Sequence, residues 1–128
     1  MKLLLDTHIL LWAAGQPEKL SGAARDLLLN PSNKLFFSAA SIWEIVIKRG
    51  LGRDDFRAEA HRLRIQLVIN GYEEVAVSSD HALALNSLPA LHKDPFDRIL
   101  IAQARTEGML LLTSDAQVVL YGDGVIAA

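Results

Sequence analysis

The sequence predicts an α/β fold, a three-layer α/β/α sandwich with a mainly parallel central sheet. Short, continuously apolar runs, such as residues 2–5 and 109–113, are typical of strands that are buried on both faces of a parallel sheet. These runs alternate along the chain with segments of helical periodicity, which is the pattern of a sheet covered by helices. With 128 residues, 51% of them hydrophobic, we expect residues 1–128 to form one domain around one core.

The first half of the chain opens with a strand and a helix, separated only by Asp6. The predicted elements are, in order, strand 2–5, helix 7–14, helix 22–29, strand 34–37, helix 38–49 and a helix from residue 54 or 55 to about residue 69. Ser21 is the expected N-cap of the second helix, and Asp54 or Asp55 that of the fourth. The fourth helix has an apolar face at helical spacing, formed by Phe56, Ala60, Leu63 and Leu67.

The second half of the chain repeats the alternation of strands and helices. The predicted elements are strand 74–77, helix 78–88, a helix from the Asp94 cap to the stop at Gly108, strand 109–113, a helical turn at 115–120 and an edge strand at 125–127. Proline at the first helical position and glycine just past the end are the usual helix boundaries, and Pro95 and Gly108 fit them.

Acidic residues recur where these elements begin or end. Asp6 directly follows the first strand, Asp97 lies in the first turn of a helix, and Asp115 closely follows strand 109–113, while Glu44 supplies a fourth acid. Ligand sites of open α/β folds lie at the carboxyl ends of the strands. Several carboxylates brought together there would hold Mg²⁺ or Mn²⁺, which can drive phosphodiester hydrolysis with either one or two ions. The sequence therefore predicts a divalent-cation site.

Helix capping is the alternative explanation for each acid taken alone. Asp6 and Asp115 could each cap the helix that follows it. Ser41 and Glu44 have the spacing of a capping box, although the apolar pattern starts that helix earlier, near residue 38. In the segment 94–97, Asp94 suits the N-cap better than Asp97 does.

Composition excludes several other classes of site and location. The absence of cysteine excludes disulfides, thiolate zinc sites and cysteine nucleophiles. The net charge of −2 gives no overall attraction to nucleic acid, so phosphate binding must be local or depend on metal. Polar residues interrupt the apolar N-terminal run at Asp6, unlike in a signal peptide, and no stretch approaches the ~20 apolar residues that span a bilayer. We expect a soluble, cytoplasmic protein without a membrane partner.

Histidines and basic residues could add contacts to a substrate or to a phosphate backbone. His8 and His92 lie near the acids, and we interpret both as local hydrogen-bonding residues rather than as groups that contact substrate. Basic residues cluster between residues 48 and 64. Those at helical spacing would form a cationic stripe, but acids are interspersed, which favours an ordinary solvated face; the stripe comprises Arg53, Arg57, His61 and Arg64.

Four stretches of the chain resemble a known family. LLLDTHILLW, SAASIWEIVIK, HKDPFDRILIAQA and LLLTSD look like the successive acidic motifs of PIN-domain ribonucleases, in the same order and over almost the whole chain. The combination of DTHILLW with DPFDR and AQA is most similar to VapC-like toxins of type II toxin–antitoxin systems.

This resemblance implies a PIN-like fold and an endoribonuclease that depends on Mg²⁺ or Mn²⁺ and cleaves RNA, often tRNA or rRNA. It places the family's catalytic and metal-binding acids on Asp6, Glu44, Asp97 and Asp115. Asp97 is preferred to Asp94 for its spacing to the following helix, and the choice between them stays open. Arg98, Thr7 and Ser114 are the candidates for contacting substrate or orienting a carboxylate. The resemblance also implies a homodimer and a cognate antitoxin.

Two other functions are alternatives to the nuclease. A catalytically inactive PIN-like module that binds RNA or protein would keep the fold without the chemistry, but all four acids are present. A phosphotransfer or receiver domain would use an aspartate such as Asp6 as a covalent acceptor. Asp6 lacks the second aspartate of a D-x-D motif, and no lysine follows a strand in the expected place.

Overall fold

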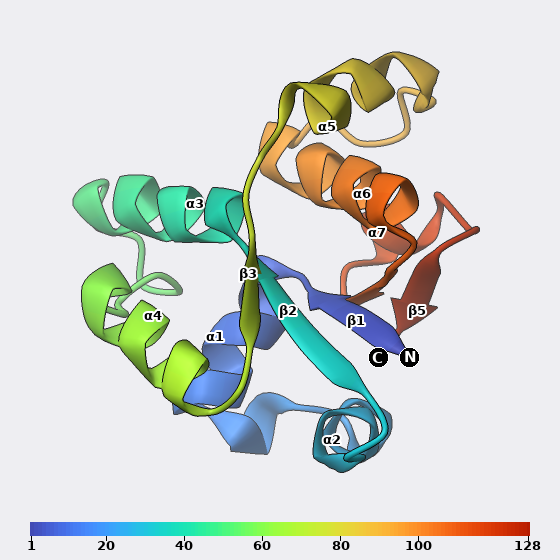
Figure 1. Cartoon of the computed structure of the whole chain (residues 1–128). Coiled ribbons are helices and arrows are strands. Elements are labelled where there is room, and N and C mark those ends of the chain that lie inside the picture. Colours follow the sequence, from blue (N-terminus) through green and yellow to red (C-terminus); the bar gives the residue numbers. More distant parts are fainter.

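A five-stranded parallel sheet forms the centre of the protein, which a computed structural model describes over residues 1–128 (Figure 1). The strand order is β3-β2-β1-β4-β5, and each of the four neighbouring pairs is parallel. All strands therefore have their carboxyl ends on one edge of the sheet. The strands are β1 (Lys2–Leu5), β2 (Lys34–Ser38), β3 (Glu73–Val75), β4 (Leu110–Thr113) and β5 (Val125–Ala127).

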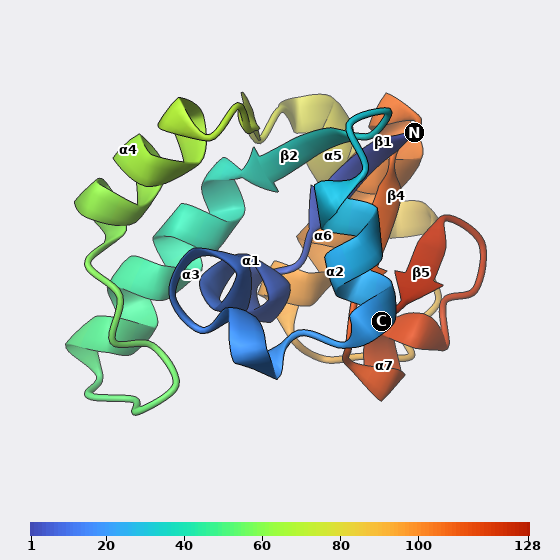
Figure 2. The same ribbon diagram turned by 90° about the horizontal axis from the view of Figure 1, so that it is seen from below.

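Helices cover both faces of this sheet, as predicted for a three-layer sandwich (Figures 1 and 2). On one side lie α1 (Thr7–Gly15), α2 (Gly22–Leu29), α3 (Ala39–Gly50) and α4 (Ala60–Ile69). On the other lie α5 (Ser79–Ala84), α6 (Pro95–Glu107) and α7 (Ala116–Val119). Two short 3₁₀ helices, η1 (Pro17–Lys19) and η2 (Leu85–Ser87), follow α1 and α5. None of the helices combines the length and apolar character needed to span a bilayer.

The central strand β1 is buried on both faces because alternate side chains enter different halves of the core. Leu3 and Leu5 pack with the α1, α3 and α4 side, whereas Leu4 packs with the α6 side. In β4, Leu112 and Leu111 divide in the same way. All five leucines are fully buried, which explains why these strands read as continuous apolar runs rather than as alternating ones.

The predicted helix from residue 54 or 55 to residue 69 is wrong in its first turn and a half. The helix α4 begins at Ala60, and the Glu59 carboxylate caps it by accepting the N–H groups of His61 and Arg62. Residues 51–59 instead form a loop with turns at 51–52 and 54–55, and Gly52 in the first turn has φ +76°. The side chain of Phe56 is fully buried, but it enters the core from this loop and not from a helix face.

The cationic stripe, the less favoured interpretation of these basic residues, does not form as a consequence. Arg53 and Arg57 lie in the loop, where each pairs with a nearby acid: Arg53 with Asp55 at 2.9 Å and Arg57 with Asp54 at 3.1 Å. The acids interspersed in the sequence thus neutralise these arginines, in agreement with the favoured interpretation of a solvated face.

Two further boundaries differ from the prediction. The strand expected at 74–77 ends at Val75, and the carbonyl of Ala76 accepts a hydrogen bond from the side chain of Gln103 at 3.3 Å instead of one from a strand. The helix expected at 78–88 divides into α5 and η2. Its start was placed correctly, since Ser78 caps α5 in a capping box with His81.

Candidate active site

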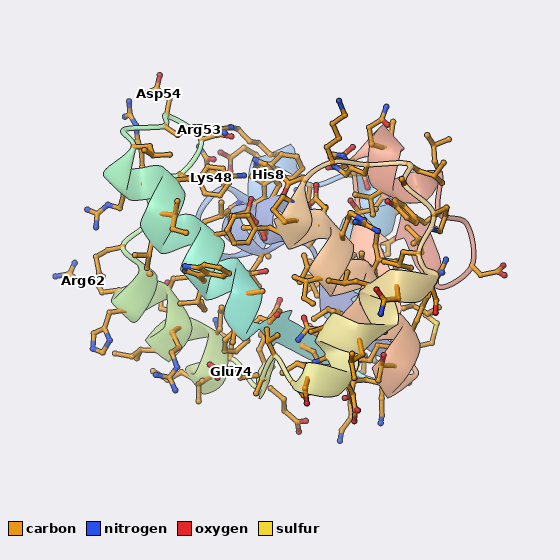
Figure 3. The ribbon with its side chains drawn as sticks, turned by 90° about the horizontal axis from the view of Figure 1, so that it is seen from above. His8, Lys48, Arg53, Asp54, Arg62 and Glu74 are labelled. Atoms are coloured by element: carbon orange, nitrogen blue, oxygen red, sulfur yellow. The ribbon has the colours of Figure 1, made fainter.

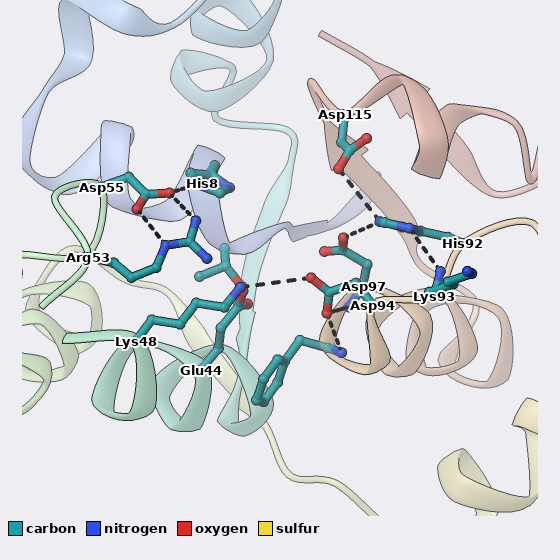
Figure 4. Close-up of polar contacts among 12 residues, drawn as sticks. His8, Glu44, Lys48, Arg53, Asp55, His92, Lys93, Asp94, Asp97 and Asp115 are labelled. Carbon is teal, nitrogen blue, oxygen red and sulfur yellow. Dashed lines mark hydrogen bonds and ion pairs between the residues drawn. The ribbon is translucent and has the colours of Figure 1, made fainter. Parts of the chain in front are cut away.

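The predicted acids converge at the carboxyl edge of the sheet. Asp6 follows β1 and Asp115 follows β4 by two residues, and these two strands are hydrogen-bonded neighbours. From opposite sides of the sheet, α3 brings Glu44 and the first turn of α6 brings Asp97. Figure 4 shows Glu44, Asp94, Asp97 and Asp115 around the same space. The topology therefore brings together acids from four distant stretches of sequence.

Asp6 is buried and has both structural and electrostatic roles. One carboxylate oxygen, Oδ1, accepts the N–H of Ile9 at 2.9 Å and caps α1, while Oδ2 accepts the hydroxyl of Thr113 on β4. Burial raises the pKa of Asp6 above its usual value, and the charge of Asp115 acts in the same direction, against the hydrogen bonds from Thr113 and Ile9. Capping thus does not remove Asp6 from the acidic centre; it fixes the carboxylate there.

Asp97 lies next to a histidine that sequence reasoning had not placed in the site. The Nε2 atom of His92 is 2.7 Å from Asp97 Oδ2 and 3.7 Å from Asp115 Oδ2. Its Nδ1 accepts the N–H of Lys93 at 3.1 Å, so the neutral ring carries its proton on Nε2 and donates it to Asp97. His92 is a local hydrogen-bonding residue, as expected, but its partners are two of the site acids. Its position just before the acidic helix start was the available signal.

The electrostatics of Asp97 reveal crowding of negative charge. Burial raises the pKa of Asp97 to about 6, and the charges of Asp94, Glu44 and Asp6 also raise it, while the hydrogen bond from His92 lowers it. A cation that enters the site would therefore stabilise the ionised form of Asp97.

Glu44 is almost completely buried, and only one of its two carboxylate oxygens has a hydrogen-bond partner. Its Oε2 lies 2.5 Å from Nζ of Lys48, one helical turn later, whereas its Oε1 is buried without any hydrogen-bond partner. The helix α3 begins at Ala39, with Ser38 as its N-cap, so Glu44 is not part of a capping box. An unpaired buried carboxylate oxygen is costly, and a bound cation or its water would satisfy it.

Asp94 performs the capping function that its sequence position suggested. Its Oδ1 accepts the N–H of Phe96 at 2.8 Å and caps α6, and its Oδ2 is 3.8 Å from Nζ of Lys48. One ligand atom each from His92, Asp94 and Asp97 lies within 4.8 Å of the others, close enough to hold a metal ion. The structure thus brings both acids of the third motif to the site.

The predicted substrate-contacting residues lie at different depths around the acids. The Thr7 hydroxyl donates to Ser41 Oγ at 3.0 Å, and both are buried. Ser114 is exposed beside Asp115. Arg98 donates to the carbonyl of Leu88 at 3.4 Å, its Nε is buried without a partner, and it forms no ion pair with the site acids.

One end of the site is bordered by the loop that follows α3. His8 Nε2 is 3.2 Å from Asp55 Oδ2, and its ring packs edge-on against Phe56. In Figure 3, His8 and Lys48 lie towards the space between α3 and α6, whereas Arg62 on α4 points away from it. His8 is therefore a local hydrogen-bonding residue, as interpreted from the sequence.

The donor set fits a hard divalent cation. Five carboxylates, from Asp6, Glu44, Asp94, Asp97 and Asp115, are accompanied by one lysine and one histidine that bridge them. Oxygen ligands of this kind suit Mg²⁺ and Mn²⁺. The unpaired Oε1 of Glu44 and the raised pKa of Asp97 both indicate negative charge that the protein leaves incompletely compensated.

Comparison with known proteins assigns this arrangement to a family. The family model described as PIN domain matches residues 3–122. The chain belongs to the PIN domain family. The match includes all four predicted acids, and the resemblance to PIN domains seen in the sequence motifs is confirmed. PIN domains are a nuclease family, so this chain belongs to a class of domains that act on nucleic acid. No curated protein sequence matched the chain.

Solved structures with the same fold come from bacterial toxin–antitoxin complexes. The chain superposes on VapBC2 from Rickettsia felis, bound to a promoter DNA fragment, with a TM-score of 0.70 and 16% identity, covering 100% of this chain and 98% of that one. For VapBC-1 from nontypeable Haemophilus influenzae the TM-score is 0.65 and the identity 19%, with coverages of 100% and 97%. A toxin–antitoxin complex from Klebsiella pneumoniae gives 0.62 and 20%, with coverages of 98% and 96%. These matches establish the fold of the PIN domain.

Proposed function

We propose that residues 1–128 form one PIN domain that acts as a metal-dependent endoribonuclease, the toxin of a type II toxin–antitoxin pair in the cytoplasm. The observation that carries the proposal is the convergence of Asp6, Glu44, Asp97 and Asp115 at one sheet edge, with a buried glutamate oxygen left unpaired. The acidic motifs and the toxin–antitoxin complexes that share the fold support it.

The four acids would hold Mg²⁺ or Mn²⁺, with Asp6 and Asp97 as the principal ligands and Asp115 and Glu44 completing the site directly or through water. When bound, the cation supplies an acidified water and neutralises the charge that develops on the scissile phosphate. The protein holds the ligands in place: Thr113 and the N–H of Ile9 fix the two oxygens of Asp6. His92 holds a proton on Nε2 and orients Asp97 with it.

We propose that RNA, with tRNA or rRNA the expected class, is the substrate. Ser114 is exposed beside Asp115 and is free to contact a phosphate. Thr7 is buried, so its contribution would be to position Ser41 and the adjacent α3 rather than to touch RNA. Arg98 would have to exchange its hydrogen bond to Leu88 for one to the substrate.

A cognate antitoxin and a second copy of the chain are the proposed protein partners. The helices α3 and α4 expose large apolar side chains that a protein partner would cover, among them Trp43, Val46, Val68 and Ile69. Ile69 is 77% exposed and Trp43 62%. The toxin–antitoxin complexes with the same fold support this part of the proposal.

The proposal is tested by incubating purified protein with total bacterial RNA, in Mg²⁺ and in EDTA. We expect discrete fragments with Mg²⁺, no fragments in EDTA and none with Asp6→Asn. The matched control is Asp26→Asn, which removes the same charge from an exposed position on α2, a helix that contributes no residue to the acidic centre. Fragments that persist in EDTA or with Asp6→Asn would contradict the proposal. Folded protein that neither cleaves RNA nor binds a divalent ion by calorimetry would instead be a binding module.

A further inference from the structure

The acidic centre already contains a cation of its own. Nζ of Lys48 lies 2.5 Å from Oε2 of Glu44 and 3.8 Å from Oδ2 of Asp94, so one ammonium bridges acids from α3 and from the start of α6 (Figure 4). The Lys48 side chain is only 16% exposed. A buried ion pair of this geometry is a fixed part of the site and not a mobile surface contact.

Aromatic rings complete the surroundings of this ammonium. Nζ lies 4.9 Å from the ring centre of Phe56 and 5.7 Å from that of Phe96. Ring faces attract an ammonium, whereas Mg²⁺ gives up its water reluctantly and requires oxygen ligands in an octahedron. The position between Glu44, Asp94 and the two rings therefore suits a lysine better than a divalent ion.

A second divalent ion would need the carboxylate oxygens that Lys48 already occupies. Oδ1 of Asp94 caps α6 and Oδ2 faces the ammonium of Lys48, whose positive charge would repel a divalent ion that approached this carboxylate. In two-metal nucleases the ions lie about 3.5–4 Å apart and share the carboxylates between them. The side of the site formed by Glu44 and Asp94 is thus filled, while Asp6, Asp97 and Asp115 have no lysine or arginine partner.

We propose that Lys48 is the built-in second cation of this PIN domain. It neutralises Glu44 and Asp94 in place of a second divalent ion, and the centre binds a single ion on the side of Asp6, Asp97 and Asp115. Glu44 keeps its unpaired Oε1 for that ion or for its water. An ammonium has three N–H donors, so Lys48 can also offer one to a phosphate oxygen of the substrate. The inference rests on the proposed function only in that a divalent ion binds; RNA cleavage is not required.

The test counts Mn²⁺ ions bound by the purified full chain, using calorimetry without RNA. We expect one ion for the wild-type protein, one for Lys48→Arg, which keeps the charge, and two for Lys48→Gln, which removes it. The matched control is Lys93→Gln, which removes the same charge from an exposed lysine beside His92 that forms no ion pair. It should bind one ion.

Electron paramagnetic resonance of the saturated proteins gives an independent reading. Two Mn²⁺ ions a few ångströms apart produce a coupled spectrum, which we expect for Lys48→Gln and not for the wild type. A wild-type protein that binds two coupled ions overturns the inference even if Lys48→Gln does not fold. One ion with unchanged affinity in folded Lys48→Gln also overturns it and leaves the proposed nuclease intact. A wild-type protein that binds no ion refutes both.

Discussion

Replacing Asp97 by asparagine should stabilise the ion-free protein at neutral pH. The side chain is only 15% exposed, and its surroundings favour the neutral carboxyl group, with a pKa raised from the usual 3.8 to about 6. Ionising it in the folded state therefore costs roughly 2 pKa units, or about 3 kcal/mol at 1.36 kcal/mol per unit. The asparagine of Asp97→Asn retains an oxygen for the His92 hydrogen bond and avoids this cost.

The pH dependence separates this effect from ordinary changes in packing. Below pH 3.8 the carboxyl group is protonated in both the folded and the unfolded state, so it does not oppose folding. As the pH rises towards 6, the unfolded chain loses the proton first, and the wild-type protein loses stability that Asp97→Asn keeps. We expect the variant to gain little at pH 4 and up to about 3 kcal/mol at pH 7.5.

Urea unfolding in EDTA, followed by circular dichroism between pH 4 and pH 7.5, measures the free energy of unfolding. Asp26→Asn, on exposed α2, is the control and should show no such trend. Adding Mg²⁺ should reverse the order at pH 7.5, because the ion stabilises the wild-type carboxylate and the variant has lost that ligand. A gain that is the same at every pH, or a loss of stability at pH 7.5, would refute the view that burial and the neighbouring acids raise the pKa of Asp97.

Three further substitutions test how the site is supported. Thr113→Val removes the hydroxyl that donates to the buried Asp6 and should cost about 1–3 kcal/mol in urea unfolding, whereas Thr106→Val at an exposed position of α6 should cost under ~0.5 kcal/mol. Phe56→Ala should cost about 3–5 kcal/mol, because the ring is fully buried from its loop; a cost below ~1 kcal/mol would show that the loop does not pack there. Gly108→Ala should destabilise the protein by about 1 kcal/mol or more, since this residue ends α6 at φ +68°, and Gly22→Ala in helix α2 should leave thermal stability equal or higher.

The sheet and its acids could be predicted because their signals are local. Leu3, Leu4 and Leu5 place apolar side chains on both faces of β1, and Asp6 follows them directly. The strand and its acid can therefore be predicted from adjacent residues. The same local pattern wrongly predicts helix for residues 54–59, which lie in a loop. Phe56 lies four residues before Ala60, which is helical spacing, but Phe56 belongs to the loop. Its ring is buried by tertiary packing and not by a helix face.

The cationic side of the site could be predicted only in part. Lys48 lies four residues after Glu44, a spacing that favours an ion pair on a helix and was a usable signal. Its second partner, Asp94, comes from another element on the opposite side of the sheet, and nothing in the sequence ties the two together. His92 likewise joins Asp97 and Asp115, and only the fold brings its second partner near.

The central position of β1 has a consequence for how the chain is made. β1 and Asp6 are made well before β4, the neighbouring strand at the site, and the hydrogen bond between Asp6 and Thr113 spans 107 residues. During synthesis, a contact between residues that are distant in sequence can form only after the later residue has been made. The acidic centre therefore cannot form on a growing chain until α6, β4 and Asp115 have been made, long after β1 and Asp6.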